Sequence, residues 1–157
     1  KNELRLVCHY DENHPGLEMV YLLGNFGTRV KGAQASLIAL SGHLKTGSWV
    51  GQGLAFYSGN VAYKRRVEAK VGRGERLLVE VPEYKGVAFR VLVDGKPAGV
   101  CGWEPNVVDI TDFAAAGGFE LAIEVIGHRR NSHGPLHHIK KQPEWVGPGE
   151  YITTSDK

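Results

Sequence analysis

Apolar and polar side chains alternate along residues 60–70, and this alternation limits the fold of the chain more than any other feature. Neighbouring side chains of a β-strand point to opposite faces, so the pattern predicts a strand with one buried face. Arg65 is the exception, since it falls in register with the apolar side chains of Val61, Tyr63 and Val67. A bulge, a partner carboxylate or a site at the edge of the sandwich would each explain it.

The same period of two recurs along the chain, whereas no apolar period of 3.6 residues persists over ten positions. It predicts strands over residues 76–81, 87–93, 107–110 and 119–125, and shorter apolar runs predict others over residues 4–9, 17–23 and 37–40. The 21 glycines fall between these runs, as expected for many tight turns. About eight or nine short strands are typical of β-sandwiches and barrels, so we expect one all-β, antiparallel domain.

Two turn signals refine this expectation. Asp94-Gly95 stands directly between two apolar runs, which predicts a β-hairpin with a type I′ turn. Pro97 follows, and because proline cannot donate a backbone hydrogen bond, the returning strand should lie at a sheet edge or begin late. Residues 111–116 predict one helical turn, with Thr111 or Asp112 as its cap.

Composition excludes several functional classes. Of the 157 residues, 42% are apolar and 23% charged, and 19 Lys and Arg against 17 Asp and Glu leave a net charge of +2. The basic residues are scattered, so nothing predicts a nucleic-acid interface, and no apolar run is long enough to span a membrane. There is no signal-peptide pattern. The chain begins at Lys1, and we expect it to be part of a longer protein. That longer protein determines the compartment, and a periplasmic or secreted location is compatible with the sequence.

The two cysteines, Cys8 and Cys101, both stand among apolar residues. Buried thiols are the favoured interpretation, because free cysteine behaves as a small apolar residue. One disulfide between them is the alternative. Residues 1–45 are less regular than residues 46–157, so we expect leading strands or a linking layer before the main sandwich.

Several segments, in this order, resemble the sugar-binding domains of glycoside hydrolase family two and its relatives. Gly53–Asn60 is similar to their Gly-x-Pro-Phe-Tyr-x-Gly stretch, although Ala55 stands where proline is more usual. Val91–Gly99 is similar to their V-x-V-D-G-x-x-x-G hairpin, and residues 109–125 to the short turn before their last core strand. Residues 17–27, 127–138 and 144–148 resemble large bacterial hydrolases of α-L-rhamnosidase-like type, and the likeness is best over residues 49–138.

The resemblance implies a jelly-roll sandwich of the galactose-binding type, a non-catalytic accessory domain whose parent chain carries the catalytic carboxylates on a separate domain. Its implied partners are an oligosaccharide or polysaccharide and that catalytic domain. It implies no cofactor beyond a structural Ca²⁺, for which the chain has no Asp-rich loop of the usual spacing. Fold alone does not determine function, so carbohydrate binding is carried over only by analogy.

Candidate sugar-contacting residues are of two kinds. Sugars are bound by aromatic faces stacked on C–H surfaces and by planar polar groups that grip paired hydroxyls. Residues 127–134 carry polar groups with almost no apolar ones, and Arg129, Asn131 and His133 suit the second task. For the first, Trp103 and Trp49 stand in polar, glycine-containing loops, with Tyr57 close by, and further aromatic candidates are Phe56, Tyr84 and Trp145.

Two alternative functions are disfavoured by their chemistry, and a third stays open. A glycosidase needs two carboxyl groups facing one another, and no spacing singles out a pair among Glu83, Asp94, Glu104, Asp109, Asp112, Glu144 and Glu150. Four histidines, at 128, 133, 137 and 138, suggest a metal-binding jelly roll, but they lack the His-x-His spacing of such sites. The close alternative is a purely structural domain that packs on its neighbours.

Overall fold

The computed structural model describes residues 3–16, 20–31, 34–114 and 117–133. These ranges hold eight β-strands and three short 3₁₀ turns, and within them there is no α-helix. Every pairing between two strands is antiparallel, so the predicted all-β, antiparallel fold is confirmed. No helix in the described part of the chain has the length and apolar character required to cross a membrane.

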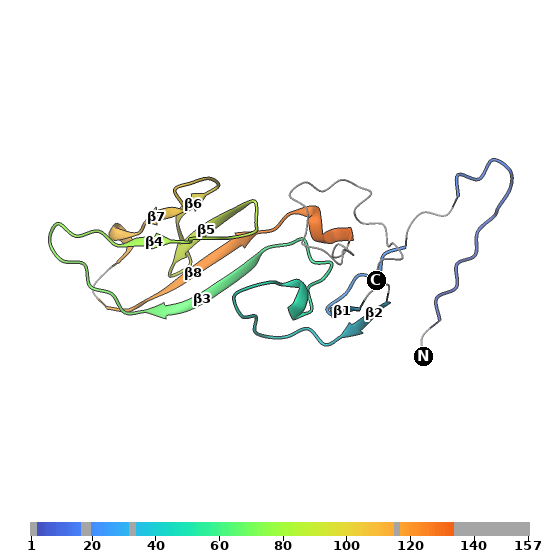
Figure 1. Cartoon of the computed structure of the whole chain (residues 1–157), viewed down its shortest axis with the longest axis horizontal. Coiled ribbons are helices and arrows are strands. Elements are labelled where there is room, and N and C mark those ends of the chain that lie inside the picture. Colours follow the sequence, from blue (N-terminus) through green and yellow to red (C-terminus); the bar gives the residue numbers. More distant parts are fainter. Residues whose placement is uncertain (1–2, 17–19, 32–33, 115–116, 134–157) are drawn as a thin grey trace.

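The largest sheet has four strands in the order β3-β8-β5-β6 (Figure 1). It comprises β3 (Val61–Val67), β8 (Phe119–Ile126), β5 (Ala88–Val93) and β6 (Lys96–Cys101). Arg65 lies on the edge strand β3 and is exposed, with no ion pair among the described residues. Its place at the sheet edge therefore explains how a charged residue occupies the apolar register.

A two-stranded sheet of β4 (Leu78–Glu80) and β7 (Val107–Asp109) forms the second layer. Between the layers Phe89, Val91 and Ile110 are at most 1% exposed. They pack with Val79 of β4, Val108 of β7 and Phe119 of β8 into one core. Strands from distant parts of the chain, each with one apolar face, thus bury these faces against each other, which makes the molecule an antiparallel β-sandwich.

The hairpin between β5 and β6 has the predicted turn. Asp94 has φ 48° and Gly95 has φ 76°, as a type I′ turn requires. The Asp94 Oδ1 also accepts a hydrogen bond from the backbone N–H of Glu120 at 2.8 Å, which ties the turn to β8. Pro97 lies in β6, and β6 is the edge strand of the sheet, as predicted.

The helical turn is present over Thr111–Phe113, but its predicted cap is wrong. Neither Thr111 nor Asp112 caps it, since the N-cap position is Ile110, which makes no side-chain hydrogen bond. Asp109 does the capping instead, because its Oδ1 accepts the backbone N–H of Thr111 at 2.9 Å. The Thr111 hydroxyl is used elsewhere and accepts the backbone N–H of Leu77 at 2.9 Å.

The N-terminal region departs most from expectation. It contains a hairpin of β1 (Gly27–Lys31) and β2 (Gln34–Ile38), of which only β2 overlaps a predicted strand. Residues 4–9 and 20–23 are not strands, and residues 17–19 lie outside the described ranges. A strand needs hydrogen bonds from a neighbour, and these segments find none in the described part of the chain.

The cysteine prediction is half right. Both thiols are free, so no disulfide forms between them. Cys101 is buried as expected, and its Sγ donates to the carbonyl oxygen of Trp103 at 3.1 Å. Cys8 is exposed, because residues 4–9 do not pack on the sandwich.

Candidate functional site

One end of the sandwich gathers most of the loops that the sequence singles out. In the four-stranded sheet, Val61, Val125, Phe89 and Cys101 lie side by side on neighbouring strands. The loops before β3, after β8, before β5 and after β6 therefore leave the sheet at the same end. Glu80 pairs with Val107 in the second sheet, next to the loop that follows β6. We call residues 56–60, 80–87, 102–107 and 127–133 the loop end.

The β6–β7 loop, residues 102–106, presents the most exposed aromatic ring of the predicted site. Trp103 is 84% exposed. The backbone beneath it is tied down by hydrogen bonds from Val107 N to Pro105 O at 2.8 Å and from Val81 N to Asn106 O at 2.9 Å. The Glu104–Pro105 peptide bond in this loop is cis. A large apolar ring is thus held in water on an anchored loop, where it has no packing role in the described structure.

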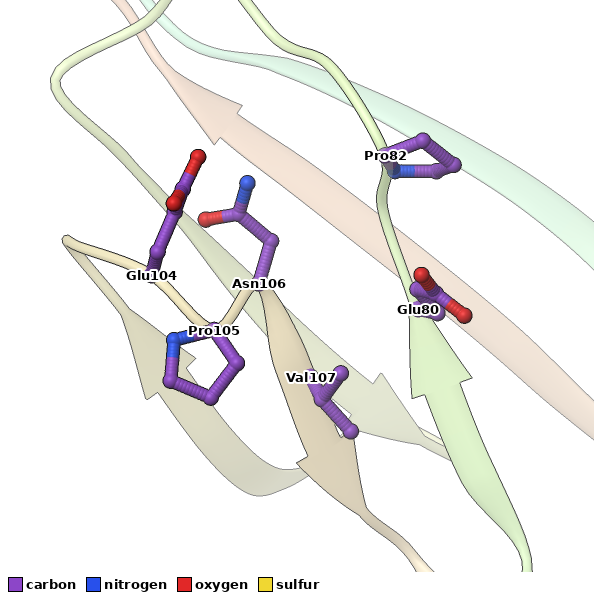
Figure 2. A pocket seen from close by; sticks show the side chains of 6 residues that line it. All are labelled: Glu80, Pro82, Glu104, Pro105, Asn106 and Val107. Carbon is purple, nitrogen blue, oxygen red and sulfur yellow. The ribbon is translucent and has the colours of Figure 1, made fainter.

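A shallow hollow of about 460 Å³ lies between the end of β4 and the β6–β7 loop, which also carries Trp103 (Figure 2). It is lined by Glu80, Pro82, Glu104, Pro105, Asn106 and Val107. Its polar groups are two carboxylates and one amide, and both carboxylates belong to exposed residues. Carboxylates accept hydrogen bonds and the amide both donates and accepts, so this set is matched to hydroxyl groups.

Trp49 and Tyr57 lie at the opposite edge of the sheet, before β3, and contact each other. Their ring centroids are 6.4 Å apart in an edge-to-face arrangement. The Trp49 Nε1 donates to the Tyr63 hydroxyl at 2.7 Å, and the Tyr57 hydroxyl donates to the Asn60 carbonyl at 2.8 Å. Because their polar atoms are already used within the chain, these two side chains hold the loop before β3.

The polar residues predicted after the last strand lie in a 3₁₀ turn, η3 (Arg129–His133). Arg129 is exposed and Asn131 half-buried, whereas the side chain of His133 lies outside what the structure describes. The turn is held to the loop before β5 by His128, whose Nε2 lies 3.1 Å from the Lys85 carbonyl. Neighbouring strands are about 4.8 Å apart, so η3 after β8 and Trp103 after β6 stand about 10 Å apart or more across the sheet.

A chain of polar contacts positions the start of the η3 loop. Asn60 Oδ1 accepts the backbone N–H of Gly127 at 3.3 Å, and its Nδ2 donates to Glu124 Oε1 at 3.0 Å. Arg90 donates to Glu124 Oε2 as well, and hydrogen bonds from Arg90 and then Asn60 lower the pKa of Glu124. A Cβ at position 127 would come within 2.1 Å of the Gly59 carbonyl oxygen, so only glycine fits there.

The site residues predicted from the sequence are therefore gathered at one end but not in one pocket. Trp49 contacts Tyr57, Trp103 directly precedes Glu104 in the loop that lines the hollow, and Arg129 and Asn131 belong to η3. Sequence reasoning named Glu104 only as one carboxylate among many and missed Glu80 and Asn106. They come together through the pairing of β4 with β7, which no local pattern reports.

The metal hypothesis finds no support in the described residues, where no three His, Cys, Asp or Glu side chains come together as metal ligands do. His137 and His138, together with Trp145, Glu144 and Glu150, lie outside the described ranges.

No protein-family model matches this chain, and no curated protein matches it. Five chains of solved structures do match. One of them is a rhamnosidase from Novosphingobium sp. PP1Y, with 23% sequence identity and a TM-score of 0.44. The match covers 68% of this chain and 10% of the rhamnosidase chain, so this protein corresponds to about a tenth of that enzyme's length.

Proposed function

We propose that this chain is a non-catalytic, carbohydrate-contacting accessory domain of the galactose-binding jelly-roll type, within a multidomain glycoside hydrolase. The observation that carries the proposal is Trp103, which is 84% exposed in the β6–β7 loop, the same loop whose Glu104 and Asn106 line a hollow. The resemblance of Gly53–Asn60 and Val91–Gly99 to sugar-binding domains supports the same class.

The chemistry of the two parts is complementary. An indole face stacks on the C–H surface of a pyranose ring, because both are apolar and flat. The carboxylates and the amide then accept or donate hydrogen bonds to the hydroxyls on the ring edge. An open hollow suits one or two residues of an extended saccharide, whereas small ligands that bind alone are mostly enclosed.

The same geometry favours binding over hydrolysis. A general acid needs a carboxyl group that burial or a like-charged neighbour keeps protonated near neutral pH. Glu80 and Glu104 are both exposed. We therefore assign them to hydrogen bonding with sugar hydroxyls and place the catalytic carboxylates on another domain of the parent chain.

Charge defines the kind of sugar. The lining of the hollow contains two carboxylates and no Lys or Arg. Uronic acids and sulfated sugars would bring like charge to this surface, which costs binding free energy. The proposed ligands are therefore neutral saccharides.

Saturation-transfer NMR against a panel of neutral and acidic oligosaccharides tests this function. Transfer to neutral members is expected at millimolar sugar, and Trp103→Ala should abolish it while leaving the far-UV circular dichroism unchanged. Tyr21→Ala is the matched control, because Tyr21 is also an exposed aromatic, at 62%, but lies far from the loop end in sequence. Absence of transfer to every sugar, or equal loss in both variants, would refute a sugar site at Trp103.

A second function, that of a packing module, is favoured by a different observation. Among the described residues 3–16 and 20–23, eight large apolar side chains are more than half exposed: Leu4, Leu6, Val7, Tyr10, Val20, Tyr21, Leu22 and Leu23. Apolar surface of this extent marks an interaction surface. A negative sugar screen, together with loss of association with the parent's catalytic domain on Leu22→Asp, would make packing the main function.

A further inference from the structure

Burial on the inner face of the four-stranded sheet decreases from β5 to β3. On β5, Phe89, Val91 and Val93 are at most 2% exposed. On β8, next to it, Phe119 and Val125 at the two ends are buried, whereas Leu121 and Ile123 between them are only partly buried. On β3, at the edge, Tyr63 is half-buried and Arg65 exposed. The second layer has only two strands, so it covers β5 fully and leaves the β8–β3 side partly open.

The strand β4 has an unpaired edge on that open side. The carbonyl oxygen of Leu77 and the backbone N–H of Val81 bond toward β7 and its flanks. Since successive backbone groups of a strand point to opposite sides, those of Leu78 and Glu80 point away from β7. Within the described ranges no strand pairs with them, so the edge of β4 can accept an added strand.

Residues 4–10 have the pattern that such a strand needs. Leu4, Leu6, Cys8 and Tyr10 recur with a period of two, and all four are exposed. An extended segment of seven residues is about 20 Å long, so it would extend beyond the three residues of β4 and lie across from β3, which has seven residues. Residues 20–23 are also exposed and apolar but lack the alternation of a strand with one face in water.

We infer that residues 4–10 of a second copy of this chain add to the free edge of β4 and cover β8 and β3, forming a strand-exchanged dimer. Two copies that exchange arms bury both apolar segments in one closed, two-fold arrangement. The occupant is a second copy because residues 3–16 lie toward the other end of the molecule's long axis from β4 (Figure 1).

Charge complements the apolar match. Arg65 stands in the inner-face register of the edge strand β3, and it makes no ion pair among the described residues. Glu12 continues the register of Leu4, Leu6, Cys8 and Tyr10, so an added arm brings a carboxylate to the inner side. Glu12, just beyond the added segment, would thus lie near Arg65 at the edge of the four-stranded sheet.

The first test is the mass of the whole chain in solution, measured by light scattering over a series of concentrations. The wild-type chain is expected to be dimeric, and Leu6→Asp should raise the dimer dissociation constant at least tenfold. Leu23→Asp is the matched control, because Leu23 is 89% exposed but stands outside the alternating segment. A monomeric wild-type chain, or equal weakening by both variants, would overturn the inference.

Cross-linking then identifies the segment that pairs with the free edge of β4. Arg65→Cys places a thiol on the inner face of β3, and the exposed Cys8 provides the second thiol, while Cys101 is buried. A short bismaleimide should give a covalent dimer, and cross-linking should fall sharply in Leu6→Asp. A link confined within one monomer would mean that the arm folds back on its own chain, which contradicts the exchange, and so would no link at all.

Discussion

Residues 4–10 and 61–67 carry the same kind of pattern, yet only the second segment is a strand in this chain. Both repeat apolar side chains at every second position, with Arg65 as the exception in the second segment. Residues 61–67 pair along their whole length with β8, from Val61 opposite Val125 to Val67 opposite Phe119. Residues 4–10 have no pairing partner in the described structure. The alternation sets the tendency to be extended, but a strand also needs a neighbour to satisfy its backbone.

The two regions also differ in what a side chain contributes to stability. Phe89 is fully buried, with its ring edge-to-face against Tyr84 at a centroid distance of 5.1 Å. The large apolar side chains of residues 4–10 and 20–23 remain largely in water. Burial, and not hydrophobicity as such, stabilises the fold, because only removal from water yields free energy.

The largest expected effect follows from deleting the centre of the core. Phe89→Ala should lower the free energy of unfolding by about 3–5 kcal/mol, since it leaves a cavity between the two sheets. Urea unfolding followed by circular dichroism measures the change. Phe56→Ala, at a residue 43% exposed, is the matched control and should cost far less. Similar losses in the two variants would mean that the sandwich core is not centred on Phe89.

Crowding between the two sheets gives a smaller effect. A Cβ on Gly99 would lie 2.5 Å from Cγ1 of Val108 on the neighbouring β7. Gly99→Ala should therefore destabilise the protein by about 1–3 kcal/mol. Gly42→Ala meets no atom within 4 Å and should leave the unfolding midpoint nearly unchanged. If Gly99→Ala were neutral, β6 and β7 would not be packed this closely.

Acid should weaken the capping at Asp109. Hydrogen bonds from the hydroxyl and backbone N–H of Thr111, and then from Arg76, lower the pKa of Asp109 from 3.8 to about 2. A lowered pKa in the folded state means that the ionised form stabilises the fold above pH 3.8, and that this contribution is lost as the pH falls toward 2. Asp109→Asn should accordingly be less stable than wild type at pH 7, with the difference shrinking below pH 3.8.

Thermal unfolding across this pH range measures the Asp109 effect. Asp112→Asn serves as the control, because Asp112 makes no side-chain hydrogen bond among the described residues and its replacement leaves the contacts of Asp109 in place. A difference between wild type and Asp109→Asn that stayed constant with pH would argue against the Thr111 and Arg76 contacts.

The smallest effect is expected in the N-terminal region. Leu23→Ala removes a large apolar side chain that is 89% exposed, so the free energy of unfolding should change by about 0.5 kcal/mol or less. Calorimetry of both proteins at one concentration is the measurement. A loss comparable to that of Phe89→Ala would show that residues 20–23 pack against the sandwich after all.

Local patterns were sufficient for the sandwich strands and for one turn. Alternation located β3, β5 and β8, and Asp94-Gly95 located the hairpin, because pleat and turn geometry act over a few neighbouring residues. The helical turn was also located, but its cap was not. Asp109 competes with Thr111 for that role, and the Thr111 hydroxyl is drawn to Leu77, which is 34 residues away.

The candidate site was predictable only in part. Trp103 could be singled out because a large aromatic residue in a polar, glycine-containing loop rarely has a core to enter. Trp49 and Tyr57 carried a similar signal but use their polar atoms to hold the loop before β3. Glu80 and Asn106 carried none, since their position beside the hollow depends on how β4 pairs with β7.

The sequence by itself determined that this chain is all-β and antiparallel, with a type I′ hairpin at Asp94-Gly95 and a proline-bearing edge strand. These features follow from side-chain period and from the backbone limits of single residues. Tertiary structure alone decided which alternating segments became strands, which cysteine was buried and which polar residues meet at the loop end. Those outcomes depend on pairing between residues far apart in the chain, whose free energy no local pattern contains.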